Sequence, residues 1–296
     1  MRRLFSRRQF LNKLTTFGSS LVSSSFLLSP NQANSQTFES VPFCSVAFNV
    51  CEAEGWPRWS QAKKKLQRNQ QWFPRFVKAI QSLNPQILSF AEAPSRETCQ
   101  DIAERLEMNV AYFPSPSDYP GALFSTFPID NQVSLEKLKE RGTQANVEKL
   151  FSRHWGWAEL QLSEKTSLIV HSVHFNPHSS SVRQQEWNCL KAQIQLQKPS
   201  TPILLQGDFN FTPQDPLYQN IQRFGLYDTF AQRGIGEAET FPSIFPQQRI
   251  DYHFCSQELL PHLIESRVCH DSPFGWKSGN LGYSLSDHLP IRTIFR

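Results

Sequence analysis

The chain has 296 residues with 39% hydrophobic and 19% charged side chains, an ordinary globular composition that is long enough to bury a sizeable core. No internal repeat, heptad run or low-complexity tract occurs beyond a serine-rich leader, which excludes repeat and coiled-coil architectures. The formal net charge at pH 7 is +4, and the six cysteines show no C-x-x-C spacing, which argues against a structural zinc site. A disulfide between Cys44 and Cys51 is left open, since these two cysteines flank one predicted strand.

Residues 1–35 have the pattern of an export signal. Arg7 and Arg8 precede Phe10 and Leu11, and a mildly apolar stretch follows over residues 17–28. Paired arginines in this position resemble a twin-arginine signal, which implies passage of the folded protein through the twin-arginine export machinery. The apolar stretch is too short for the roughly 20 residues that cross a bilayer, so no stable membrane span is expected. We therefore expect a bacterial-type protein that is exported to the periplasm or the cell exterior.

The basic excess of the chain belongs to this leader. Residues 1–35 carry five basic and no acidic residues, which leaves 25 basic and 26 acidic residues in the remainder. A nearly neutral domain gives no support for broad electrostatic capture of nucleic acid, which usually needs a basic face. The one basic run, Lys63-Lys64-Lys65 with Arg68, predicts the solvated start of a helix, with a phosphate-contacting rim as the alternative.

Short apolar segments along the chain each deliver a polar side chain near their ends, and we expect them to be strands. The first two such segments, 45–48 and 86–91, lead to Asn49 and Glu92, and the segment 168–173 leads to His174. Because ligands bind where strand ends converge, several polar strand ends in one domain suggest one shared site. His171 points to the opposite face of its strand from His174, so a hydrogen-bonded structural role is expected for it.

Three later segments repeat this design. The apolar run 203–205 ends in Gly207-Asp208-Phe209-Asn210, where the glycine lets the backbone turn so that a carboxylate and an amide emerge together. Segment 250–255 carries Asp251 and His253, and the turn before the strand 291–295 carries Asp287 and His288. The alternative to a site is a simple strand-to-loop turn, since Asp and Asn favour turns. Acids, amides and imidazoles at six such endings, with no lysine, instead indicate a divalent-cation site beside acid-base groups.

The clearest helix is predicted over residues 181–196. It would bury an apolar stripe and direct five polar side chains outward, namely Arg183, Gln184, Gln185, Glu186 and Lys191. Strand-like segments alternate irregularly with helical ones along the chain, which favours a mixed α/β sandwich over a doubly wound sheet.

Taken in order, these motifs resemble the endonuclease/exonuclease/phosphatase superfamily, which includes deoxyribonuclease-like nucleases, apurinic-site endonucleases, neutral sphingomyelinases and inositol-polyphosphate phosphatases. The resemblance is carried by Asn49, Glu92, His174, Gly207-Asp208-Phe209-Asn210, Arg249-Ile250-Asp251 and Ser286-Asp287-His288. The segment 121–129 is also similar to the family's strand after the metal-binding glutamate. The resemblance covers residues 41–296 and implies an α/β fold of two packed mixed β-sheets flanked by helices, a four-layer α/β sandwich. We expect the protein to be a monomer.

The resemblance also implies a metal-dependent phosphoric ester hydrolase. Glu92 would hold Mg²⁺, or alternatively Mn²⁺ or Ca²⁺, with Asn49 and Asp287 near it. The implied catalytic residues are His174, Asp208, Asn210, Asp251 and His288. Asp208 would position or deprotonate the attacking water while Asn210 fixes its orientation. His288, held by Asp251, would contact the scissile phosphate or act as general base, and His174 would donate to a phosphate oxygen.

The expected substrate is a phosphodiester, with an endonuclease acting on nucleic acid as the first hypothesis. A sphingomyelinase-like or other phospholipid phosphodiesterase, or a phosphomonoesterase, is the alternative within the same chemistry. A metal-binding module without catalysis is the hypothesis from another class. A basic groove lined by aromatic residues would favour the nuclease, and an exposed apolar hairpin beside the site would favour a lipid substrate.

Overall fold

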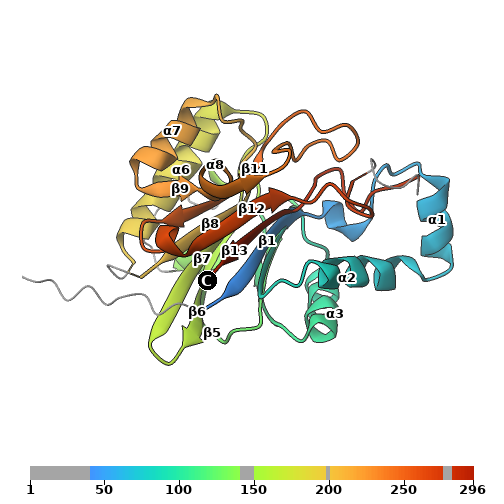
Figure 1. Cartoon of the computed structure of the whole chain (residues 1–296), viewed down its shortest axis with the longest axis horizontal. Coiled ribbons are helices and arrows are strands. Elements are labelled where there is room, and N and C mark those ends of the chain that lie inside the picture. The colour runs from blue at the N-terminus through green and yellow to red at the C-terminus, as the bar shows by residue number, and fades with distance from the viewer. Residues whose placement is uncertain (1–40, 141–149, 198–200, 276–281) are drawn as a thin grey trace, which may run out of the picture. The chain divides into compact units, whose positions relative to one another are not determined.

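Two mixed β-sheets pack face to face in this computed structural model, which describes residues 41–140, 150–197, 201–275 and 282–296 (Figure 1). One sheet has seven strands in the order β10 (Gly234–Ile235), β12 (Leu263–Val268), β13 (Ile291–Phe295), β1 (Phe43–Asn49), β2 (Ile87–Ala91), β4 (Gly121–Ser125) and β3 (Asn109–Phe113). The other has six, in the order β5 (Ile129–Ser134), β6 (Trp155–Ser163), β7 (Thr166–His174), β8 (Ile203–Asp208), β11 (Asp251–Ser256) and β9 (Leu226–Asp228). The strands expected from the apolar segments are all present.

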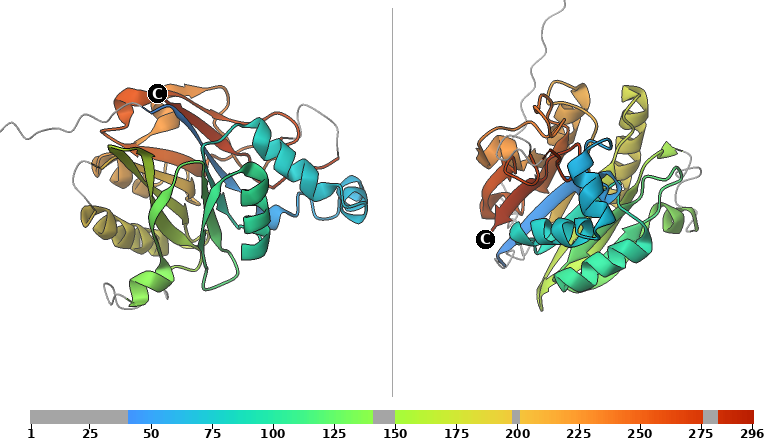
Figure 2. Two further views of the ribbon diagram at one scale, coloured as in Figure 1. Left: turned by 90° about the horizontal axis from the view of Figure 1, so that it is seen from below. Right: turned by 90° about the vertical axis from the view of Figure 1, so that its right-hand side faces the viewer.

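Helices cover the outer face of each sheet, so the expected four-layer sandwich is confirmed (Figure 2). The seven-stranded sheet packs against α2 (Trp72–Ser82) and α3 (Arg96–Leu106), and the six-stranded sheet packs against α6 (Ser180–Gln195) and α7 (Pro216–Arg223). A third apolar cluster, which includes Phe43, Leu123 and Leu204, fills part of the space between the sheets. The remaining short elements are η1 (Cys51–Ala53), α1 (Gln61–Arg68), α4 (Leu135–Glu140), α8 (Thr229–Arg233) and η2 (Leu260–His262).

These elements belong to one unit of the chain, Gln36–Arg296. The predicted twin-arginine signal, residues 1–35, lies outside the residues that the structure describes. Within the described residues, no helix combines the length and the apolar character that a membrane crossing requires. All six cysteines lie in the described part, and none of them forms a disulfide there. Cys44 lies near the start of β1 and Cys51 lies past its other end, in η1, so the strand separates them by more than the roughly 7 Å that a disulfide can bridge between Cα atoms.

Helix α6 matches its predicted bounds closely, but two of the side chains expected to face solvent are buried. The Ser179 hydroxyl caps the helix by accepting from the Val182 N–H. Arg183 and Glu186 turn instead to the loop that follows β7: the Asn176 N–H donates to Glu186 Oε2 at 2.9 Å, and Arg183 Nη1 donates to the Asn176 carbonyl at 3.0 Å. The N–H and the carbonyl of Asn176 therefore provide hydrogen-bond partners for these two side chains, and this face of α6 is buried instead of facing solvent.

The basic run at α1 is also corrected at one position. Ser60 caps the helix, and Lys64, Lys65 and Arg68 are exposed as expected of a solvated helix. Lys63 is buried instead, and its Nζ donates to the Gly55 carbonyl at 3.3 Å. The long lysine side chain thus holds the turn that precedes the helix, and only three of the four basic groups face water.

Candidate active site

The strand order brings the predicted site residues to one edge of both sheets. β1 and β2 are parallel with Asn49 beside Ala91, and β7 and β8 are parallel with His174 beside Asp208. Parallel neighbours place their carboxyl ends at the same edge, so each sheet presents two polar strand ends there. The two pairs meet across the sandwich, where Asn49 Nδ2 donates to Asp208 Oδ2 at 3.0 Å.

Asp208 lies at the centre of this group and is 1% exposed. Its Oδ1 accepts from the Asn210 N–H at 3.0 Å, while its Oδ2 lies 3.5 Å from His174 Nε2 and 3.8 Å from His288 Nε2. Burial and the nearby carboxylate of Asp251 raise the pKa of Asp208 above its ordinary value. One carboxylate oxygen thus faces an amide and two imidazoles at the same time.

Glycine is required just before Asp208. Gly207 has φ +139°, and a Cβ at this position would lie 2.0 Å from the Val173 carbonyl oxygen of the neighbouring strand. The missing side chain lets β8 approach β7 and still deliver Asp208 to the edge. Asn210 follows with φ +50°, and its Nδ2 donates to the Phe175 carbonyl at 2.9 Å, which ties the end of β8 to the end of β7.

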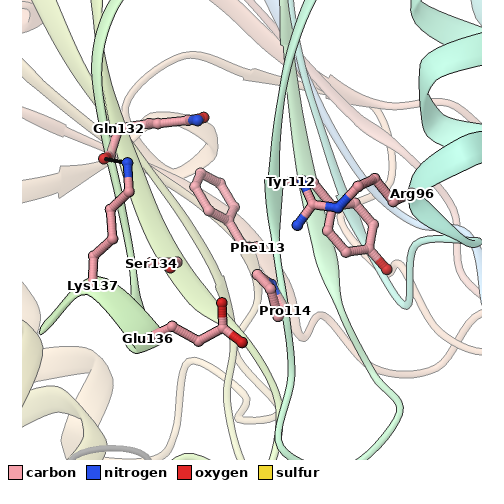
Figure 3. A pocket seen from close by; sticks show the side chains of 8 residues that line it. All are labelled: Arg96, Tyr112, Phe113, Pro114, Gln132, Ser134, Glu136 and Lys137. Carbon is pink, nitrogen blue, oxygen red and sulfur yellow. Dashed lines mark hydrogen bonds between the residues drawn. The ribbon is translucent and has the colours of Figure 1, made fainter. Parts of the chain in front are cut away.

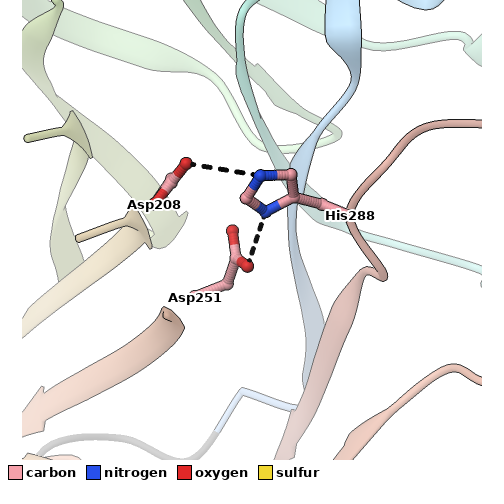
Figure 4. Close-up of side chains that lie close together, drawn as sticks. All are labelled: Asp208, Asp251 and His288. Atoms are coloured by element: carbon pink, nitrogen blue, oxygen red, sulfur yellow. Dashed lines mark hydrogen bonds and ion pairs between the residues drawn. The ribbon is translucent and has the colours of Figure 1, made fainter. Parts of the chain in front are cut away.

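Asp251 and His288, 37 positions apart, form a direct pair (Figure 4). Asp251 Oδ2 lies 2.9 Å from His288 Nδ1, and the ring points its other nitrogen at Asp208. The ring also packs on Phe241, with the ring centres 4.8 Å apart. Burial alone would lower the pKa of His288, but the carboxylates of Asp251 and Asp208 outweigh burial and raise it. The imidazole is therefore held as a cation in a fixed orientation.

Glu92 and Asp287 form a second acidic group at the same edge. Burial, followed by the charge of Asp287, raises the pKa of Glu92, and a hydrogen bond from Asn49 works in the opposite direction. Ser286 joins this group to the site, since its Oγ donates to the Asn49 carbonyl at 2.6 Å and accepts from the His288 N–H at 3.2 Å. Two repelling, partly buried carboxylates beside an amide are the hard oxygen donors that a divalent cation prefers, so these residues fit the expected metal.

A second set of metal-ligand types is more compact. Ligand atoms of Asp208, Asp251 and His288 lie within 4.8 Å of one another. Their atoms already contact each other, however, and a protonated imidazole has no lone pair for a metal. The residues that could hold a cation are therefore Asn49, Glu92 and Asp287, whereas Asp208, Asp251 and His288 are arranged so that they could exchange protons.

His174 lies on the β7 side of the site. Two residues that the sequence did not predict, Tyr119 and Arg153, lie beside it. Burial lowers the pKa of His174 well below its ordinary value, and electrostatic repulsion from His154, Arg153 and His288 adds to this effect. Tyr119 meets the His174 ring edge to face at 6.4 Å, and the Arg153 guanidinium stacks on the Tyr119 ring at 3.7 Å. The available signal for Arg153 is its position two residues before β6, because β6 starts beside the end of β7.

The sequence expectation for His171 is confirmed. It lies on the other face of β7, where Trp155 Nε1 donates to its Nδ1 at 3.2 Å and Gln197 contacts its Nε2. A separate pocket of about 240 Å³ lies beside the edge strands β3 and β5, with Arg96 and Tyr112 on one side and Gln132 and Lys137 on the other (Figure 3). None of the predicted site residues lines this pocket.

A two-sheet α/β sandwich with acid and imidazole groups gathered at one edge is an arrangement suited to the hydrolysis of phosphate esters. The sequence agrees: residues 48–288 match the Endonuclease/Exonuclease/phosphatase family, and the chain belongs to that family. No sequence among the curated proteins matches the chain.

Solved structures of low sequence identity share the fold. An endonuclease/exonuclease/phosphatase from Bacteroides vulgatus superposes with a TM-score of 0.66 at 16% identity, over 86% of this chain and 98% of that one. A mannosyl-6-phosphatase from Bacteroides thetaiotaomicron has a TM-score of 0.65 at 16% identity, over 86% of this chain and 100% of that one. Truncated TDP2 from Caenorhabditis elegans has a TM-score of 0.59 at 15% identity, over 86% of this chain and 97% of that one.

Proposed function

We propose that this protein hydrolyses phosphoric esters by attack of a water molecule on phosphorus. The observation that carries the proposal is the position of Asp208 Oδ2, which lies within 3.8 Å of Asn49 Nδ2, His174 Nε2 and His288 Nε2. A carboxylate oxygen surrounded by proton donors can hold a water and accept its proton, while the same donors face the phosphate.

Each residue has a task in this reaction. Asp208 orients the attacking water and takes its proton. His288, kept charged and oriented by Asp251, faces the negative charge that develops on the phosphoryl oxygens. His174 donates to a non-bridging oxygen, and the Arg153 cation beside it favours binding of the anionic group. Asn210 keeps the Asp208 loop in place through the Phe175 carbonyl.

The proposal includes dependence on a divalent cation, with Mg²⁺ as the first choice. Glu92 and Asp287 would bind it, with Asn49 beside them. When bound, the cation neutralises a phosphate oxygen and stabilises the leaving oxygen.

A phospholipid phosphodiesterase is the second candidate, and an exposed loop beside the site favours it. Residues 241–248 form a loop that is closed by the pairing of Phe241 with Gln248. Phe241 packs on His288 at the base of the loop, whereas Phe245 is 70% exposed. Trp59, on the chain between η1 and α1, is also 70% exposed. Exposed aromatic side chains of this kind insert at lipid–water interfaces, while the near-neutral domain charge gives no matching support for nucleic acid.

One assay panel tests both candidates. The purified protein with Mg²⁺ is given DNA, RNA, sphingomyelin vesicles and the small soluble diester bis-p-nitrophenyl phosphate. We expect hydrolysis of at least one ester, and loss of it in Asp208→Asn, which keeps the size of the side chain. Phe245→Ser should reduce hydrolysis of vesicles but leave the soluble diester unaffected if the substrate is a lipid. Undiminished activity in Asp208→Asn would refute the proposed mechanism.

The leader extends the proposal to location. Arg7, Arg8 and the apolar stretch 17–28 support export of the folded enzyme by the twin-arginine machinery to the periplasm or the exterior. The substrate would then be met outside the cytoplasm, where phosphoric esters of lipids and of released nucleic acid are accessible.

A further inference from the structure

A layer of buried polar side chains lies between the sheets directly below the catalytic residues. Gln206 is two residues before Asp208 on β8, and His253 is two residues after Asp251 on β11. Residues two apart on a strand share a face, so Gln206 and His253 point into the same space between the sheets as the two aspartates. They are opposite each other in the β8–β11 pairing, and both are 0% exposed.

These two side chains reach across to the other sheet. Ser45 Oγ donates to Gln206 Oε1 at 2.5 Å, and His253 Nδ1 lies 2.5 Å from Thr293 Oγ1. Ser45 and Thr293 are themselves neighbours in the β1–β13 pairing, so the four residues form a polar crossing of the sandwich. Below this crossing the space between the sheets is filled by the apolar cluster that includes Leu204 and Phe295. The polar groups are thus confined to the end that carries the site.

Several atoms in this region have no hydrogen-bond partner among the residues that the structure describes. They are Gln206 Nε2, His253 Nε2 and Ser89 Oγ in the polar layer, and Asp251 Oδ1 in the catalytic layer above it. A buried polar atom left unpaired loses its hydration without a replacement, so four such atoms in one region would destabilise the fold. Their chemistry is complementary, because the Gln206 amide offers N–H donors and the free Asp251 oxygen is an acceptor.

Burial lowers the pKa of His253 to about 3, so its ring is neutral at physiological pH. One ring nitrogen of a neutral imidazole donates and the other accepts. With Nδ1 engaged by Thr293, the Nε2 atom has a single hydrogen-bond position left, on a residue that lies opposite Gln206 in the β8–β11 pairing. An internal water needs two to four polar partners, and Gln206 Nε2, His253 Nε2 and Asp251 Oδ1 are three such atoms.

We propose that an ordered internal water binds between Gln206, His253 and Asp251, and that Gln206 and His253 are positioning residues that act through it on the Asp251–His288 pair. The water holds the free Asp251 Oδ1. The other oxygen, Oδ2, then stays aligned with His288 Nδ1 instead of rotating away from it. The functional part of this inference rests on the proposed hydrolase activity, whereas the water site itself does not.

Three variants test the positioning role on a small soluble phosphodiester. His253→Phe fills the space with a ring that has no polar atom, and we expect kcat to fall on the order of tenfold to a hundredfold with KM nearly unchanged. His253→Gln, which restores a polar nitrogen near the same place, should recover most of kcat. Cys255→Ala is the matched control: it lies two residues further along the same face of β11, and it should lower thermal stability without changing kcat.

A high-resolution crystal structure of the wild-type protein tests the water site directly. We expect a water within roughly 3.2 Å of at least two of Gln206 Nε2, His253 Nε2 and Asp251 Oδ1. An empty or apolar-filled space there would overturn the proposal even if no ester is hydrolysed, or if His253→Phe fails to fold. A cooperatively folded His253→Phe with wild-type kcat would overturn the positioning role. A wild-type protein that holds the water but hydrolyses no ester would instead count against the proposed function alone.

Discussion

Glu186 is a buried acid whose ionisation should make the stability of this protein depend on pH. It lies on the inner face of α6 and is 0% exposed, with Oε2 accepting from the Asn176 N–H at 2.9 Å. Burial, the largest influence, raises its pKa from 4.5 to about 8, against the lowering effects of the Asn176 N–H, Arg183 and Arg153. Glu186→Gln keeps the shape of the protonated acid but cannot ionise.

The sign and the size of the effect follow from these two pKa values. Between pH 4.5 and about 8 the unfolded chain gives up the Glu186 proton while the folded protein keeps it. The folded state then binds more protons, so its stability falls as pH rises through this window. Each pKa unit is worth about 1.4 kcal/mol, and the full window therefore corresponds to a loss on the order of 5 kcal/mol. The stability that the protonated Glu186 contributes is complete below pH 4.5 and absent above about pH 8.

Urea unfolding at several pH values measures this loss. The free energy of unfolding of Glu186→Gln minus that of the wild type should grow by about 1.4 kcal/mol per pH unit across the window and stay level outside it. Gln185→Glu, which puts a carboxylate on the exposed face of the same helix, is the control and should show no such trend. A difference between Glu186→Gln and the wild type that stays constant from pH 5 to pH 8 would refute the reasoning, because it would mean that the carboxylate is hydrated or fully paired.

Three further outcomes concern the site and the leader. Glu92→Ala should raise the Mg²⁺ requirement and depress turnover, and full activity of this variant in EDTA would contradict the metal assignment. Asp251→Ala, His288→Ala and the double variant should lose similar factors, on the order of 10³ in kcat, whereas losses that multiply would show that the two residues act separately. Changing Arg7 and Arg8 to Lys should leave folded protein in the cytoplasm, and cell fractionation that finds undiminished export would argue against the twin-arginine route.

The strands and their polar ends were predictable because the physics that makes them is local. β1, β2, β7 and β8 are buried along their whole length or nearly so, which produces continuous apolar runs in the sequence, and a polar residue at the end of such a run is conspicuous. That these ends face one another across two sheets is not local. Asn49 and Asp208 are 159 positions apart. The pattern of polar strand ends suggested one shared site, and the resemblance to a known family implied what each residue does in it.

The errors have the same origin. Lys63 and Glu186 have the charge and the spacing of solvated helix positions, so a reading of one helix at a time assigns them to solvent. Their burial depends on what the opposing surface presents, which is the Gly55 carbonyl for Lys63 and the Asn176 N–H for Glu186. Arg153 was missed because its nearness to the site depends on the pairing of β6 with β7, which the sequence of that segment alone does not show. In each case the partner lies in a different segment from the residue.

The position of β1 between β2 and β13 has a consequence for biosynthesis. β13 begins at Ile291, 242 residues after Asn49, so one side of β1 has no partner until that much more chain has been made. At roughly 5–20 residues per second this takes on the order of 10 to 50 seconds. During that time the unpaired edge of β1, whose seven residues are all buried in the finished sheet, is open to association with other chains. The nascent protein should therefore need a chaperone that shields this edge, and any step that requires a folded protein must wait for β13 to pair.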